Sequence, residues 1–330
     1  MTALKPLSNV LAYRSHIMLF SALWILCCHS VSIMGTEQWT FLQMFKPLIA
    51  FGWGGVDIFL FLSGLGIGLS LSKRPQFNSF FSKRFNRIFY SFFIIVTIVH
   101  IANQTSTIDY ILDTTTLSYW LPLFGINATN SFWYISAAFA FYLLSYPYYN
   151  LFFYKKPLLS TIIISLIGLI CYKLLFGKID FFLARIPIYF IGMYSSKFVC
   201  QSFKSTPFIL LSIIAYSAMS LIAWKFGGLT LSSTGLNFIF FIFITPGLVF
   251  LLSSFFKFLD NMKWGKYLNK TFNILGKYSL EIYLVHWGLL CMMKEFEWNI
   301  NWFIFIGITI LISFAVKITS NLIISINRNI

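Results

Sequence analysis

Long apolar stretches separated by short polar loops repeat along the whole chain. They fall at about residues 16–34, 50–72, 88–102, 131–153, 158–176, 181–196, 207–225, 237–256, 275–293 and 300–325. The stretches are continuous and do not alternate between apolar and polar residues, so they are not the strands of a β-barrel. A helix needs about 20 apolar residues to cross a membrane. The pattern therefore predicts an all-α integral membrane protein with about ten transmembrane helices.

The composition agrees with this fold class. Hydrophobic residues make up 58% of the chain and charged residues only 10%, against about 25% charged residues in an average soluble domain. The mean hydropathy of +0.81 excludes a water-soluble enzyme and a disordered chain. Because apolar stretches cover the chain, we expect residues 1–330 to form a single transmembrane domain. The five cysteines have no metal-ligand spacing, so we expect no metal site.

The net charge of +15 has its simplest explanation in membrane topology. If the chain starts in the cytoplasm and crosses ten times, Arg185 and Lys317 lie within helices and few basic residues face outward. Because Lys and Arg favour cytoplasmic loops, we expect both termini in the cytoplasm and the protein in the cell (inner) membrane. We expect contacts with membrane lipids and none with nucleic acid. The predicted outer side contains only Lys46, Lys173, Lys178, Lys225 and Lys294.

Ionisable side chains within the apolar stretches are costly and point to function. His29 lies about 9 Å below the outer end of the first predicted helix, and Asp57 lies about 10 Å below that of the second, at 1.5 Å per residue. A carboxylate that orients an imidazole is the usual arrangement of a general base. Two separate polar residues, each bonded to another helix, would give the same pattern. The full set is His29, Asp57, Arg185, Glu281, His286 and Lys317.

Two further basic features lie at the predicted cytoplasmic side. Arg84 and Arg87 stand three residues apart, so on a helix they share one face. Two guanidinium groups on one face suit a phosphorylated ligand, but taken alone they are explained better by the positive-inside rule and lipid headgroups. Lys317 lies near the end of the last stretch, where we expect its side chain to reach the membrane surface.

Several short motifs in a fixed order resemble the membrane-bound acyltransferase family 3, which O-acylates sugars. The resemblance covers about residues 13–287, and we expect no added soluble esterase-like domain. The motifs are Tyr13-Arg14 followed by His29, Gly55-Val-Asp57, Arg84-x-x-Arg87, Trp133-Tyr-Ile-Ser136, Arg185-Ile-Pro187 and Ser279-Leu-Glu281 followed by His286.

The resemblance implies an O-acyltransferase with no permanently bound cofactor. Cytoplasmic acyl-CoA, with acetyl-CoA as the first candidate, would be the donor substrate. A hydroxyl of a cell-surface glycan or lipid-linked sugar would be the acceptor. In this reading His29 would be the catalytic base, and Asp57 would orient its ring.

The remaining residues of the motifs would bind the two substrates. The donor phosphates would contact Arg14, Arg84 and Arg87. The acceptor or the developing oxyanion would contact Arg185, Glu281 and His286.

Two other functions fit the same composition. A transporter or flippase of a lipid-linked glycan would use the buried charges as a substrate or proton path. No inverted repeat is visible in the sequence, and the paired arginines all lie on one predicted side, which disfavours this alternative. In a non-catalytic scaffold, the matched depths of His29 and Asp57 would have arisen by chance.

The predicted topology can be tested with reporter fusions. We expect a reporter placed after Lys83 to be cytoplasmic and a reporter in the 103–130 loop to be external, because the basic residues follow the positive-inside rule. The measurement compares the activity of a reporter that works only in the cytoplasm with that of one that works only outside. Two reporters on the same side would contradict the ten-helix topology.

Overall fold

All regular structure that the computed structural model describes is helical, which confirms the all-α class. The structure describes residues 5–34, 46–127, 132–227, 235–298 and 300–329. The α-helices are α1 (Pro6–Ala12), α2 (Arg14–Met34), α4 (Lys46–Ala50), α5 (Gly55–Leu71), α6 (Phe77–Ala102), α7 (Thr107–Thr114), α8 (Trp133–Tyr148), α9 (Pro157–Leu174), α10 (Asp180–Leu183), α11 (Ile186–Ser195), α12 (Thr206–Phe226), α14 (Leu236–Leu259), α15 (Lys263–Gly276), α16 (Ser279–Glu295) and α17 (Trp302–Asn329). Short 3-10 or π turns are η1 (Gly52–Gly54), η2 (Ser118–Phe124), η3 (Tyr149–Phe153) and η4 (Ser196–Phe198).

Each predicted apolar stretch contains a helix, although residue 131 lies outside the described residues. In the described part of the chain, seven helices are long and apolar enough to cross a membrane. The helices of three other predicted stretches are shorter, with 16 residues in α8, 10 in α11 and 17 in α16. The structure therefore supports an integral membrane protein, while the number of crossings and the side of each terminus stay predictions.

The stretch predicted at 181–196 is divided into two short helices. α10 ends at Leu183, and α11 begins at Ile186 with Pro187 in its first turn. Proline has no backbone N–H and is tolerated in a helix chiefly at this first turn. The break leaves Arg185 at the junction between the two helices, where its side chain points into the interior and is only 2% exposed.

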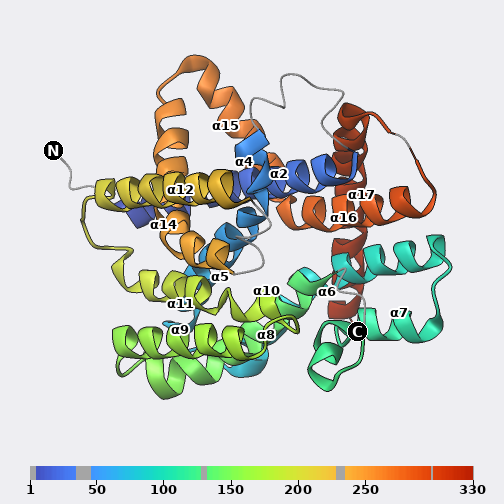
Figure 1. Cartoon of the computed structure of the whole chain (residues 1–330), viewed down its shortest axis with the longest axis horizontal. Coiled ribbons are helices and arrows are strands. Elements are labelled where there is room, and N and C mark those ends of the chain that lie inside the picture. Colours follow the sequence, from blue (N-terminus) through green and yellow to red (C-terminus); the bar gives the residue numbers. More distant parts are fainter. Residues whose placement is uncertain (1–4, 35–45, 128–131, 228–234, 299, 330) are drawn as a thin grey trace.

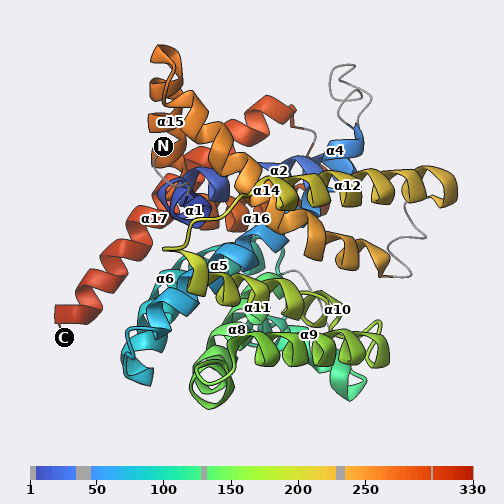
Figure 2. The ribbon, with the colours of Figure 1, turned by 90° about the vertical axis from the view of Figure 1, so that its left-hand side faces the viewer.

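Helix α5 lies at the centre of the structure. Figures 1 and 2 show it between α2 and α14 on one side and α11 on the other, and it packs against all three. Its glycines permit this close packing. A Cβ atom at Gly64 would lie 2.0 Å from the carbonyl oxygen of Tyr189, and one at Gly192 would lie 2.2 Å from that of Phe61. Small residues at such crossings are typical of membrane helix pairs.

Helices α9 and α12 cover the outside of this centre with apolar side chains. Figure 2 shows α12 projecting from the helices around α5. On α12, Trp224 is 84% exposed and Ile214 is 66% exposed, while Leu174 at the end of α9 is 76% exposed. Large exposed apolar surfaces need an apolar environment. The exposed faces of α9 and α12 are therefore of the kind that suits an apolar environment.

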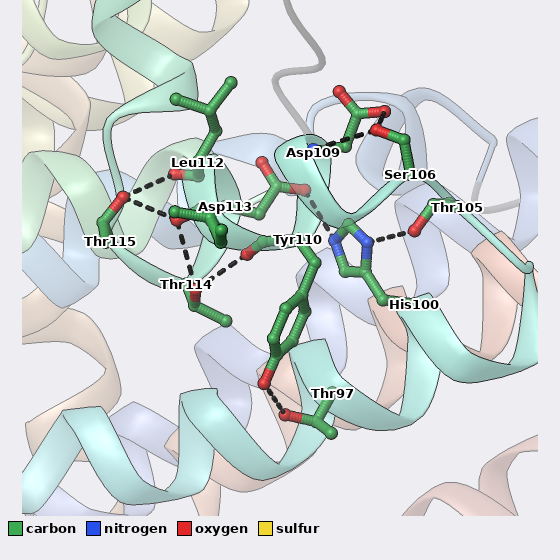
Figure 3. A network of polar contacts seen from close by, with 11 residues as sticks. Thr97, His100, Thr105, Ser106, Asp109, Tyr110, Leu112, Asp113, Thr114 and Thr115 are labelled. Atoms are coloured by element: carbon green, nitrogen blue, oxygen red, sulfur yellow. Dashed lines mark hydrogen bonds and ion pairs between the residues drawn. The ribbon is translucent and has the colours of Figure 1, made fainter.

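Helix α7 is fixed to the end of α6 by a network of polar side chains (Figure 3). The His100 ring lies between Thr105 and Asp113, with Nε2 3.0 Å from the Asp113 Oδ2 atom and Nδ1 hydrogen-bonded to the Thr105 hydroxyl. The Tyr110 hydroxyl hydrogen-bonds that of Thr97 at 3.0 Å. Because every contact of this network lies between α6, α7 and their connection, we assign it a structural role.

Candidate active site

A cavity of about 410 Å³ lies among α2, α5, α8, α9, α10, α14 and α16. Aromatic side chains form most of its wall, and a few polar groups face it. This combination is typical of a site for a small organic ligand. The cavity is lined by His29, Trp53, Val56, Trp133, Tyr172, Phe176, Asp180, Phe181, Arg185, Asn237, Phe238 and Tyr283.

Two histidines from distant parts of the chain meet at this cavity. The Nδ1 atom of His29 on α2 lies 3.1 Å from the Nε2 atom of His286 on α16. The two rings are nearly parallel, with centroids 5.4 Å apart. His29 lines the cavity, whereas His286 is fully buried. The Nδ1 atom of His286 lies 3.1 Å from the backbone carbonyl oxygen of Ile282.

These partners determine which ring nitrogens carry hydrogens when both rings are neutral. The carbonyl oxygen of Ile282 can only accept, so His286 must carry its hydrogen on Nδ1. The Nε2 atom of His286 is then an acceptor, and it receives the hydrogen bond from Nδ1–H of His29. His29 consequently carries its lone pair on Nε2. This is the tautomer that a general base needs when its Nδ1 side is held by an acceptor.

Asp57 pairs with Arg185 and not with His29, which corrects the pairing expected from the sequence. The Oδ1 atom of Asp57 lies 3.5 Å from Nε of Arg185, and both residues are 2% exposed. The sequence placed His29 and Asp57 at similar depth, but depth does not determine which way each side chain points around its helix axis. The hydrogen bond expected from Asp57 to the imidazole is made by His286.

Arg185 brings a positive charge into the cavity wall. Its guanidinium lies over the rings of Trp133 and Phe238, 4.9 Å and 4.8 Å from their centroids. It also donates a hydrogen bond of 3.2 Å to the carbonyl oxygen of Phe181. An arginine between aromatic faces with one carboxylate partner is held in position, so its charge has a defined place at the cavity.

The three predicted phosphate-binding arginines gather in a second place. The charges of Arg84 and Arg87 act on that of Arg14, so the three groups from α2 and α6 are neighbours. The Arg14 guanidinium packs on α5, where a Cβ atom at Gly66 would lie 3.2 Å from its Nη1 atom. Arg84 donates a hydrogen bond of 2.6 Å to the carbonyl oxygen of Phe80. We call Arg14, Arg84 and Arg87 the arginine cluster.

Glu281 lies outside the set of cavity-lining residues. Its Oε1 atom is 2.9 Å from Nζ of Lys317 and accepts a 2.9 Å hydrogen bond from the Ser91 hydroxyl. The sequence analysis missed this ion pair because it expected Lys317 to reach the membrane surface. The contact joins α16 to α17 and α6 and so contributes to their packing, while contact of Glu281 with an acceptor stays a prediction.

Four polar residues of the cavity wall were not identified from the sequence: Tyr172, Asp180, Asn237 and Tyr283. Burial raises the pKa of the Asp180 carboxyl. The backbone N–H of Gly177 donates a 2.7 Å hydrogen bond to the same carboxyl and fixes it at the start of α10. The sequence gives no sign of Asp180, because a charged residue before an apolar stretch is typical of an ordinary loop. Tyr283 could have been identified, because it lies within one of the motifs that resemble the family. Within the described residues, no group of three His, Cys, Asp or Glu side chains could hold a metal ion.

Comparison with known proteins gives one match. A family model described as an acyltransferase domain matches residues 19–319. The matched region begins after Arg14 and includes all other predicted site residues. No curated protein and no solved structure matches the chain.

The Asp57–Arg185 contact predicts a strong energetic coupling. We expect Asp57→Asn to lower thermal stability, because removal of one partner of a buried ion pair costs about 3–5 kcal/mol. The double variant Asp57→Asn/Arg185→Gln should lose less than the sum of the two single losses. Thermal unfolding of the purified proteins in detergent measures this coupling, with Glu295→Gln as the control because Glu295 is exposed. Losses that simply add would contradict the pairing.

Proposed function

The chain belongs to the membrane-bound acyltransferase family 3, and from that membership we propose that it transfers an acyl group, with acetyl as the first candidate, from cytoplasmic acyl-CoA to a hydroxyl of a cell-surface glycan or lipid-linked sugar. The observation that carries the proposal is the contact between His29 and His286, which leaves the lone pair of His29 on Nε2. Membership in an acyltransferase family favours this function over a transporter or flippase.

The cavity at His29 supports a sugar as the acceptor. Sugars present apolar C–H faces and a rim of hydroxyl groups. The rings of Trp53, Trp133 and Tyr283 offer flat apolar surfaces for such faces. Asp180 and Asn237 offer hydrogen-bond partners for the hydroxyl groups. A glycan end or lipid-linked sugar therefore matches the cavity better than a purely apolar acceptor does.

His29 would act as the general base in a direct transfer. As an acceptor hydroxyl attacks the thioester carbonyl, Nε2 of His29 takes the hydroxyl proton and a new C–O ester bond forms. The C–S bond then breaks, and the leaving CoA sulfur receives the proton from His29. The products are the ester and free CoA, and no oxidant or metal is needed. Arg185 supplies positive charge in the cavity wall, where it can stabilise the developing oxyanion.

His286 would be a positioning residue for this step. In many enzymes a carboxylate holds the catalytic imidazole in the correct tautomer. Here the imidazole of His286 takes the position of that carboxylate, and the Ile282 carbonyl determines the tautomer of His286. Asp57 would act indirectly, because it keeps the charge of Arg185 in position.

The arginine cluster would bind the donor. Guanidinium groups form paired, charge-assisted hydrogen bonds with phosphate oxygens. Arg14 and Arg84 lie on different helices, α2 and α6, and α16 packs against both, so the cluster depends on how the fold places these helices. The donor would thus enter from the cytoplasm, with its thioester directed along α2 and α5 to the cavity in the membrane.

We expect His29→Ala to abolish glycan acylation. A positioned imidazole contributes about a hundred- to ten-thousandfold to the rate, and Ala removes it. The measurement is mass spectrometry of surface glycans from a deletion strain that carries each variant at matched membrane levels. Cys27→Ala on the same helix serves as the control and should restore acylation. Normal acylation by His29→Ala would exclude His29 as the base.

The role of His286 predicts different effects of two substitutions of similar volume. The side-chain oxygen of Gln can accept the hydrogen bond from His29, whereas the thioether sulfur of Met accepts only weakly. We expect His286→Met to lower kcat by about ten- to a hundredfold with the donor KM unchanged, and His286→Gln to retain most of the activity. Initial rates of the purified variants over a range of acetyl-CoA concentrations measure both constants. Equal losses in the two variants would show that His286 contributes packing only.

A further inference from the structure

A second polar cavity, of about 370 Å³, lies between α6 and α17. Helix α6 contributes Lys83, Asn86 and Arg87, and the last two lie three and four residues from Lys83, so all three share one face of the helix. Helix α17 contributes the opposite wall. Its lining residues there are Lys317, Asn321, Ile324 and Ser325.

The cavity is strongly positive. Lys83, Arg87 and Lys317 supply three cationic groups, and the side chains of Asn86 and Asn321 add amide donors. The lining contains no carboxylate. Glu281, which is fully buried, neutralises part of the Lys317 charge through its 2.9 Å contact. A phosphate monoester carries a charge of about −1.5 to −2 near neutral pH and three acceptor oxygens, so it complements this lining better than a singly charged anion does.

Arg87 connects this cavity to the arginine cluster. It lines the cavity, and its charge also acts on Arg14 and Arg84. The protein therefore presents two positive positions linked by Arg87, one at Arg14 and Arg84 and one at Lys83 and Lys317 between α6 and α17. Coenzyme A carries its phosphates in two separate groups, a diphosphate and a ribose 3′-phosphate monoester. The protein thus has two positive positions, and coenzyme A has two phosphate groups that could occupy them.

We infer that the cavity between α6 and α17 binds the ribose 3′-phosphate of the acyl-CoA donor, with Lys83 and Arg87 on one side and Lys317 and Asn321 on the other. This inference rests on the proposed function. The diphosphate then lies at Arg14 and Arg84, and the acyl end extends away from α17 toward His29. The headgroup phosphate of an anionic lipid has related chemistry, and the experiment separates the two sources.

The test compares acetyl-CoA with 3′-dephospho-acetyl-CoA as donors for purified protein in phosphatidylcholine nanodiscs. For the wild type, loss of the 3′-phosphate should raise the donor KM about tenfold or more. Lys83→Ala and Asn321→Asp should raise the KM for acetyl-CoA about three- to tenfold and leave that for the dephospho donor unchanged. Both residues are exposed, so the variants should fold. Lys73→Ala, at another exposed lysine, is the control and should change neither KM.

Two results would overturn the inference. One is an equal KM of the wild type for both donors. The other is an equal rise for both donors in Lys83→Ala, since the lysine would then act without regard to the 3′-phosphate. Equal donor KM values together with activity that rises with phosphatidylglycerol, and no longer does so in Lys83→Ala, would assign the cavity to a lipid headgroup.

A wild-type protein that consumes neither donor would contradict the proposed function and not the cavity. In that case the cavity is tested by calorimetry, which measures the binding of adenosine 3′,5′-bisphosphate and of adenosine 5′-monophosphate to the protein. The inference expects tighter binding of the bisphosphate to the wild type, and loss of this preference in Lys83→Ala. Equal binding of the two nucleotides would reject it.

Discussion

The constraint on which the structure depends is that ionisable side chains inside an apolar bundle must have partners. An unpaired buried charge costs several kcal/mol, so each such group determines how its helix is rotated and which helix lies beside it. Each pair here joins segments that are far apart in the sequence. The pairs are His29 with His286, Asp57 with Arg185, and Glu281 with Lys317.

The arginine cluster and the cavity at His29 are separated along the lengths of α2 and α5. Arg14 and His29 lie fifteen residues apart on α2, about 22 Å at 1.5 Å per residue. The long Arg14 side chain reaches Gly66 on α5, which is nine residues, or about 14 Å, from Asp57. The arginine cluster thus lies at one level of the bundle and the cavity at another. A donor with charged phosphates at one end and a thioester on a flexible arm suits this separation.

The sequence predicted the helices well and their mutual orientation poorly, for physical reasons. Hydrophobic length locates a membrane helix, and Arg84 and Arg87 both lie on α6, three residues apart. The sequence placed His29 and Asp57 at similar depth in the membrane. The direction in which each side chain points depends on how its helix is rotated, and this is determined by packing partners that a single sequence does not show. The partner of Lys317 was missed for the same reason, because Glu281 lies on another helix.

In the proposed reaction, the protein breaks the thioester of acyl-CoA in order to acylate a hydroxyl. The most direct measurement is the release of free CoA thiol from acetyl-CoA by the purified wild-type protein in lipid nanodiscs, followed continuously with a thiol reagent. The account predicts release well above that of protein-free nanodiscs, with a further rise when a sugar acceptor is added. Intact acetyl-CoA throughout, while the reconstituted protein moves a lipid-linked glycan across vesicle membranes, would contradict the account and identify a flippase.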